Sequence, residues 1–190
     1  MFFNRLFLKR LATSDKIIYA SIYTCMKTRK IPIKYVPKNL SAADKKRQIN
    51  ALRRSKKQYK KGVYYTRKRV KSFKSKPSKH VLHARNIYGV DHVRPDNELS
   101  KKTGCSVDAL NQIVRKGEGA YYSSGSRPNQ TAQSWGIARL ASAITAGKAA
   151  SIDYDIIENG CDHKGTAFIL ANKSRKKYGH GHSSAPKISI

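Results

Sequence analysis

The sequence predicts a mainly α-helical protein, in which a long basic N-terminal arm, part helical and part extended, precedes a small helical domain at residues 81–170. The first observation behind this prediction is the charge distribution. Residues 27–80 carry 21 basic groups and one acid, whereas residues 81–170 carry ten basic and nine acidic groups. The second is the recurrence of apolar residues at helical spacing in several short segments after residue 78. The third is the composition, because 190 residues that are 39% hydrophobic allow one modest core.

The overall charge restricts the classes of function. The chain has a formal net charge of +29, which argues against a self-contained metabolic enzyme and calls for a polyanion or an acidic protein surface. Its longest uncharged apolar run, residues 17–26, falls short of the ~18–20 residues of a spanning helix, so no membrane span is expected. Three cysteines are too few for a disulfide framework and fit a reducing compartment.

Composition divides the chain into four segments. Residues 1–26 are apolar and basic, and they fit a targeting segment, an extension that docks on a partner, or an upstream extension of the gene with Met26 as the usual start. A cationic arm, 27–80, and the compact helical domain, 81–170, follow. Residues 171–190 read as a second basic tail, rich in Gly, Ser and His.

One helix is predicted within the arm, from about Ala42 to Tyr59, with a capping-box-like start at Ser41. Its apolar stripe is thin, because Ile49 and Leu52 are almost the only large apolar residues before its end. A helix of this kind is not held by a core of its own. We therefore expect it to lie on something anionic or to remain marginal.

The second part of the arm, residues 60–80, interleaves aromatic and basic residues, and its serines and Pro77 favour an extended chain. This composition fits binding of a phosphate backbone with some stacking on bases. The alternative is a tail that threads between acidic protein partners. The candidate residues for binding anions or nucleic acid are Lys56, Lys57, Lys60, Lys61, Tyr64, Tyr65, Arg67, Lys68, Arg69, Lys71, Lys74 and Lys76.

Three short helices are predicted next, each ending at a glycine. The first spans 78–88, the second 96–102, and the third starts at Ser106 and ends at Gly117. The pair at 96–117 resembles a helix-turn-helix, although a plain helical corner is the favoured interpretation. In a helix-turn-helix, the residues that read a DNA groove would be Asp108, Asn111, Gln112 and Arg115.

A loop rich in small and hydrogen-bonding residues, 119–131, leads into a predicted helix at 132–145. A Ser-Gly-Ser-Arg turn that runs into a helix N-terminus can hold an anion. The favoured alternative is a structural loop whose serines and Asn129 satisfy buried backbone groups. The candidate residues for the loop anion site are Ser124, Gly125, Ser126, Arg127 and Thr131.

Two further helices are predicted, at 151–159 and 166–173, and this region offers no convincing catalytic or metal motif. Asp153, Asp155 and Glu158 could hold Mg²⁺, but a solvated face of a capped helix is the better interpretation. Neither the Cys161-Asp-His163 run nor His180-Gly-His182 has the spacing of a zinc site. We therefore expect no metal and no cofactor.

Three motifs resemble a poorly characterised family found in large eukaryotic DNA viruses and tailed phages. They are YVPKNLSAADKKRQI, KKGVYYTRKRVKSFKSKPS and, most specifically, AYYSSGSRPNQTAQSWGIARLASAITAGKA. The resemblance covers roughly residues 33–160 and carries no established activity. It implies a viral setting, and hence a role in the virion or in association with DNA.

These observations lead to three functional expectations. The first is a non-enzymatic structural protein of the virion, a minor capsid or internal component of a large assembly, whose cationic arm contacts capsid proteins, packaged double-stranded DNA or both. The second is a DNA-binding protein that uses the helix pair at 96–117. The third is an enzyme acting on nucleic acid, with Tyr121, Tyr122, Ser124 and Arg127 at its site.

Overall fold

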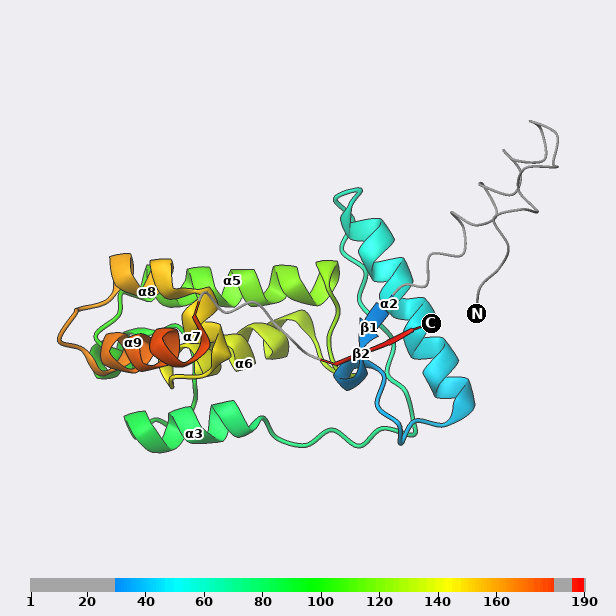
Figure 1. Cartoon of the computed structure of the whole chain (residues 1–190), viewed down its shortest axis with the longest axis horizontal. Coiled ribbons are helices and arrows are strands. Elements are labelled where there is room, and N and C mark those ends of the chain that lie inside the picture. The colour runs from blue at the N-terminus through cyan, green and yellow to red at the C-terminus, as the bar shows by residue number, and fades with distance from the viewer. Residues whose placement is uncertain (1–29, 180–185, 190) are drawn as a thin grey trace, which may run out of the picture. The chain divides into compact units, whose positions relative to one another are not determined.

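The computed structural model describes residues 30–179 and 186–189, and this part of the chain is mainly α-helical, as predicted (Figure 1). The expectations for residues 1–26 and for the His180 and His182 pair lie outside the described residues. Among the helices within the described ranges, none is both long enough and apolar enough to cross a membrane.

The chain divides into two compact units. The described part of the first is a pair of short antiparallel strands, β1 (Lys30–Pro32) and β2 (Lys187–Ser189). The described part of the second, residues 33–179, holds the helices and includes most of the segment that the sequence analysis treats as an arm.

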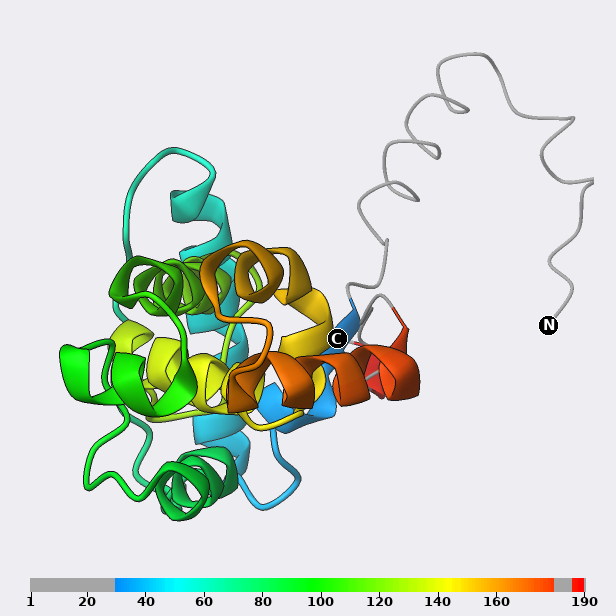
Figure 2. The same cartoon turned by 90° about the vertical axis from the view of Figure 1, so that its left-hand side faces the viewer.

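Two helices form an antiparallel hairpin at the centre of the helical unit, and the others pack around them (Figures 1 and 2). The central pair is α5 and α6. Helix α3 contacts α6, helix α8 contacts α5, and α7 and α9 pack on each other and on α6. The elements are the 3₁₀ turn η2 (Ile33–Tyr35) and the helices α2 (Ala42–Tyr59), α3 (Lys79–Tyr88), α4 (Asn97–Thr103), α5 (Val107–Ser123), α6 (Ala132–Ile144), α7 (Lys148–Ile152), α8 (Tyr154–Gly160) and α9 (Thr166–Tyr178).

Most of the predicted helix starts and stops are present. The side chains of Asp96, Ser106 and Thr131 cap α4, α5 and α6 by accepting a backbone N–H three residues on. Gly89 and Gly104 end α3 and α4 in the left-handed conformation that the absence of a Cβ allows. Local chemistry thus sets these boundaries.

The predicted end of α5 at Gly117 is wrong, because the helix continues to Ser123. A Cβ atom added at Gly117 would lie 2.6 Å from the Cα of Gly136 on α6, and one added at Gly136 would lie 2.8 Å from the carbonyl oxygen of Val114. These glycines therefore serve the close crossing of α5 and α6, and Gly117 does not terminate its helix.

The predicted helix at 151–159 is in fact two helices, because α7 ends and α8 begins at Asp153. Ser151, the predicted N-cap, lies inside α7, where its buried hydroxyl donates to the carbonyl oxygen of Ser174. The carboxylate of Asp153 is buried as well. It accepts from Arg139 at 2.6 and 2.7 Å, and Lys116 lies 2.8 Å away.

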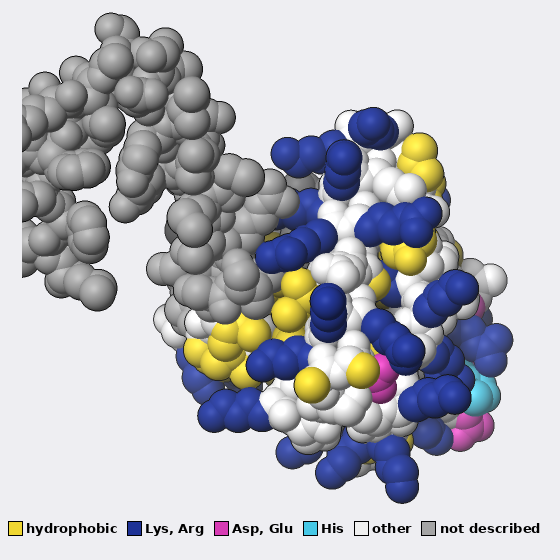
Figure 3. Space-filling model, turned by 90° about the vertical axis from the view of Figure 1, so that its right-hand side faces the viewer, with side chains coloured by type: hydrophobic (Ala, Val, Ile, Leu, Met, Phe, Trp, Pro, Cys, Tyr) yellow, Lys and Arg dark blue, Asp and Glu magenta, His cyan; other side chains and the backbone are white. Residues whose placement is uncertain are grey.

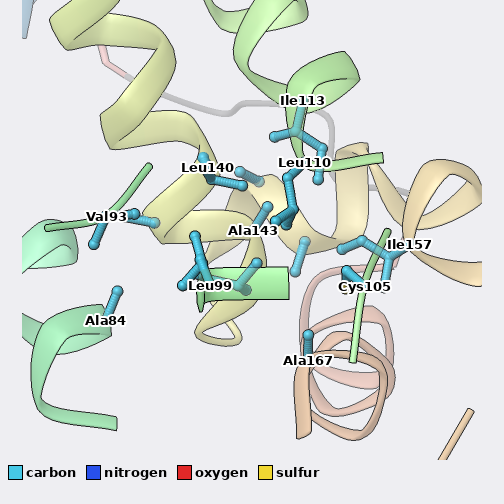
Figure 4. Close-up of a cluster of buried hydrophobic side chains, with 14 of the residues drawn as sticks. Ala84, Val93, Leu99, Cys105, Leu110, Ile113, Leu140, Ala143, Ile157 and Ala167 are labelled. Atoms are coloured by element: carbon cyan, nitrogen blue, oxygen red, sulfur yellow. The ribbon is translucent and has the colours of Figure 1, made fainter. Parts of the chain in front are cut away.

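The core of the helical unit is built from short apolar and small side chains of α3 to α9, with Leu99, Leu110 and Leu140 near its centre (Figure 4). Cys105 and Cys161 form a disulfide, so the prediction that the cysteines fit a reducing compartment is wrong for this pair. The bridge joins the start of α5 to the end of α8.

Candidate nucleic-acid interface

Helix α2 has the predicted bounds, but its buried stripe is largely polar. Asp44, Gln48, Leu52 and Ser55 are buried at helical spacing, while every Lys and Arg of the helix is exposed. Gln48 donates to the carbonyl oxygens of Tyr35 and Ser126 at 3.1 and 3.4 Å, which explains how a helix with so few apolar residues is held. No anionic ligand is needed to fix it.

Asp44 is the only carboxylate in residues 33–80, and it is buried. It accepts hydrogen bonds from the backbone N–H and the hydroxyl of Ser72 at 2.9 and 2.8 Å, and Arg47 lies 3.3 Å away. The hydrogen bond from the Ser72 backbone is the main cause that lowers the pKa of Asp44. The exposed surface of residues 33–80 therefore carries no carboxylate.

The extended segment that follows α2 is anchored by Arg67, whose side chain is 8% exposed. Its guanidinium donates to the hydroxyls of Ser55 and Ser126, at 3.1 and 2.7 Å, and to the carbonyl oxygen of Tyr121 at 3.0 Å. It also stacks on the Tyr121 ring, 3.6 Å from the ring centroid. Burial lowers the pKa of Arg67 from its usual value. A residue predicted to bind anions thus holds two parts of the protein together.

Asn129 provides a second anchor. It adopts a positive φ of 60°, and its side chain accepts from the backbone N–H of Val70 and donates to the carbonyl oxygens of Val70 and Phe73. An Asn side chain can hydrogen-bond an extended backbone as a neighbouring strand would, because its amide has both donors and an acceptor. The extended segment is therefore pinned at several points.

The anchors place the extended segment antiparallel to α2. Arg67 meets Ser55 near one end of the helix, and Ser72 meets Asp44 near the other. Eleven residues of helix and five residues of extended chain both span about 16 Å, so the two runs match in length. Helix and segment together form one supported surface.

This surface, which we name the cationic face, consists of exposed Lys and Arg side chains from both runs. Figure 3 shows the side of the molecule on which they gather, with few acidic side chains among them. The first five members were not among the residues predicted from the sequence to bind anions. They recur along α2 at spacings that keep them clear of its buried stripe. The members are Lys45, Lys46, Arg47, Arg53, Arg54, Lys56, Lys57, Lys60, Lys61, Lys68, Arg69, Lys71, Lys74 and Lys76.

The 124–131 loop uses several of its predicted anion-binding groups within the protein. Ser126 accepts from Arg67 and donates to the carbonyl oxygen of Arg127, and Thr131 forms a reciprocal capping box with Ser134. A Cβ at Gly125, where φ is +101°, would lie 2.7 Å from Leu52. The loop therefore packs on α2, a contact that was not predicted from the sequence.

Two other predicted anion ligands of the loop, Ser124 and Arg127, are exposed. The charge of Arg127 adds to burial in lowering the pKa values of Lys34 and His80. The anion site proposed for this loop stays a prediction.

Helices α4 and α5 occupy the segment predicted to be a helix pair, and the helix-turn-helix interpretation stays a prediction. Gln112 donates to Asp108 at 2.7 Å, and Asn111 donates to the backbone of its own helix. A pocket of about 310 Å³ lies between α5 and α8, lined in part by Asp108 and Asp155. Two carboxylates at this position disfavour a phosphate backbone.

The residues considered for catalysis are not gathered around one pocket. Tyr121 is fully buried and its hydroxyl accepts from the backbone N–H of Arg67, whereas Ser124 is exposed. Asp153 is engaged by Arg139 and Lys116. Within residues 30–179 and 186–189, no group of three His, Cys, Asp or Glu side chains is placed to hold a metal ion.

The fold and this surface define a small, mainly α-helical protein with a supported cationic face. Residues 32–159 match the model of a family of unknown function, DUF5824, and the chain belongs to this family. The comparisons with curated proteins and with solved structures found no match.

Proposed function

We propose that this protein is a non-enzymatic structural protein that binds the phosphate backbone of nucleic acid along the cationic face. The resemblance to a viral family supports a setting inside a virion, where such a face would bridge packaged DNA and capsid subunits. The observation that carries the proposal is the burial of Asp44, because residues 33–80 then expose fourteen cations of the cationic face and no carboxylate.

Phosphate fits this face better than an acidic protein surface. Duplex DNA presents one charge per ~1.7 Å of its axis, so a run of about 16 Å faces a dense line of phosphates. Lys68, Arg69 and Lys71 lie between anchored residues of the extended segment, and Lys74 and Lys76 follow the last anchor. Seven further cations lie on the exposed side of α2. A repetitive ligand suits this repetitive surface. No specific base contact is needed.

The helix pair at 96–117 is the less supported alternative. Its outer face carries an exposed Asp108 beside the Asp155 of α8, and its amides hydrogen-bond within their own helix. Binding of random duplex without sequence preference would separate the proposal from this alternative.

The test is binding of full-length protein to random duplex DNA across a salt series. Counterion release predicts that affinity falls by ~0.9 decades per decade of salt for each phosphate contacted, so about five contacts give a slope near −4.5. Exchange of Lys68, Arg69 and Lys71 for Gln should weaken binding and reduce the slope by about 2 to 3.

The matched control exchanges Lys173, Lys176 and Lys177 of α9 for Gln, which removes the same charge from exposed positions elsewhere. This control variant should keep the slope of log affinity against log salt within about 0.9 of the wild-type slope, the change expected for one phosphate contact. Equal losses in both variants would show that binding follows net charge alone and would refute a defined face. Absence of salt-sensitive binding in the wild type would assign the face to protein partners.

A further inference from the structure

Three tyrosines form a cluster at one end of the cationic face. Tyr59 ends α2, Tyr64 follows the next turn, and Tyr122 lies in the last turn of α5. The rings of Tyr59 and Tyr122 are stacked, with centroids 6.1 Å apart and planes 8° apart. The Tyr64 ring packs edge-on against both, at 5.9 Å from Tyr59 and 5.0 Å from Tyr122.

The backbone around the cluster is constrained on both sides. Gly62 adopts a positive φ of 75°, and the backbone N–H groups of Lys61 and Val63 both donate to the carbonyl oxygen of Gln58, so the chain turns back toward α2. The carbonyl oxygen of Tyr122 accepts from the Ser55 hydroxyl at 3.2 Å. Little conformational freedom remains to be lost when a flat ligand packs on these rings.

Exposure distinguishes Tyr64 from the other members. Its side chain is 68% exposed, whereas Tyr59 and Tyr122 are half-buried beneath it. Neighbouring Tyr65 differs, because the guanidinium of Arg54 lies 4.5 Å from its ring centroid. Most of the Tyr64 side chain is therefore accessible to a ligand, beside the partly exposed rings of Tyr59 and Tyr122.

The chemistry around Tyr64 indicates what that ligand is. Lys56, Lys57, Lys60 and Lys61 lie in the same helix end and turn, and no carboxylate of residues 33–80 is exposed. A flat π-system with an attached anionic backbone satisfies both the ring and the lysines. A base of single-stranded nucleic acid has this combination, whereas in a duplex the bases are already stacked on one another.

We propose that Tyr64, supported by Tyr59 and Tyr122, is a stacking site for an unpaired base of single-stranded nucleic acid. This inference rests on the proposed function, since the same cationic face supplies the phosphate contacts. It adds a preference for unpaired strands or ends over continuous duplex.

The experiment compares a dT20 oligonucleotide with an abasic 20-mer that keeps the phosphates and lacks the bases. Wild-type protein should bind dT20 more tightly, and Tyr64→Leu should reduce dT20 affinity by about 5- to 150-fold, the effect of removing one stacking ring. Binding of the abasic strand should be unchanged in this variant. Tyr64→Phe, which keeps the ring, should retain wild-type affinity for dT20.

The outcomes separate this inference from the function it rests on. Equal affinity of wild type for both strands, or equal affinity of Tyr64→Leu and Tyr64→Phe for dT20, would overturn the stacking site while leaving salt-dependent duplex binding intact. Failure to bind either strand or duplex would overturn both proposals. Thermal unfolding of the two variants serves as a folding control, and both should be fully folded at the temperature of the binding measurement, although Tyr64→Leu loses the ring contacts with Tyr59 and Tyr122.

Discussion

Arg67 shows how one residue in a run of basic residues acquires a role of its own. Its neighbours Lys68 and Arg69 are exposed, whereas its guanidinium is surrounded by two serine hydroxyls, a backbone carbonyl and an aromatic ring. Within residues 33–80 it has no carboxylate partner, because Asp44 is engaged by Ser72 and Arg47. Its charge is balanced by neutral dipoles.

The exchange Arg67→Met should lower the free energy of unfolding by about 2–4 kcal/mol, because it removes charge-assisted hydrogen bonds and leaves their buried acceptors unpaired. Urea denaturation measures this loss. Trypsin cleavage between residues 68 and 76 should also accelerate, since the anchor of the extended segment is gone.

The matched variant Lys68→Met removes the same kind of charge from an exposed side chain and should stay within about 0.5 kcal/mol of wild type. Equal stability of the two variants would mean that Arg67 is not an anchor.

No sequence pattern distinguishes Arg67 from the basic residues beside it. The sequence predicted that Asn129 and the loop serines form hydrogen bonds within the protein, because a loop rich in such residues can satisfy buried backbone groups. Their partners were not predicted, since those partners lie 59 residues away along the chain. Hydrogen bonds over such separations leave no local signal.

At the scale of elements, the crossing of α5 and α6 depends on two facing glycines. The backbones approach so closely at Gly117 and Gly136 that neither position has room for a methyl group. The same glycines weaken each helix in isolation, so the crossing offsets a local cost.

We expect Gly136→Ala to lower the free energy of unfolding by about 1–3 kcal/mol, because its Cβ would overlap the backbone of Val114. Gly119→Ala in α5 is the matched control. Its Cβ would meet only the Tyr59 hydroxyl, at 3.4 Å, so the gain in helix propensity should leave stability unchanged or raised. Thermal unfolding of both variants decides the matter, and an equal decrease in both would contradict a close crossing.

Helix boundaries followed from sequence wherever a cap set them, as at Ser106 and Gly104. The predicted boundaries were wrong at Gly117 and Asp153, where tertiary contacts determine the structure. A glycine at a helix crossing has the same sequence signature as a terminating one. A buried Asp that accepts from Arg139 looks like a first-turn acid suited to a helix dipole.

At the scale of the whole molecule, the disulfide between Cys105 and Cys161 closes a loop across 56 residues of sequence. Such a bridge restricts the unfolded chain and stabilises the fold by roughly 4 kcal/mol in the chain-entropy treatment. The double exchange of both cysteines for Ala should lower the urea midpoint accordingly. Cys25→Ala, which keeps the bridge, should not.

Thiol titration of the oxidised, denatured chain gives an independent check. With three cysteines in the sequence and two in the bridge, one free thiol should react. Reaction of three thiols would show that the bridge does not form.

The mainly helical class was predictable because charge and apolar periodicity are properties of long segments. The packing of residues 33–78 on the helical part was not, because this packing uses isolated polar contacts in place of an apolar stripe. The cationic character of the face was evident from sequence. Its continuity along α2 required the structure, which shows where Asp44 is buried.

The burial of Asp44 has a consequence for how the environment acts on the face. Its exposed charges belong to Lys and Arg alone. Ammonium and guanidinium groups are, as chemical classes, bases whose protonation does not change around neutral pH. Acidification of a compartment would therefore neither raise nor lower the affinity of the cationic face for a phosphate backbone. Salt and competing polyanions would lower this affinity instead. A particle that depends on the contact would therefore respond to ionic strength and not to pH.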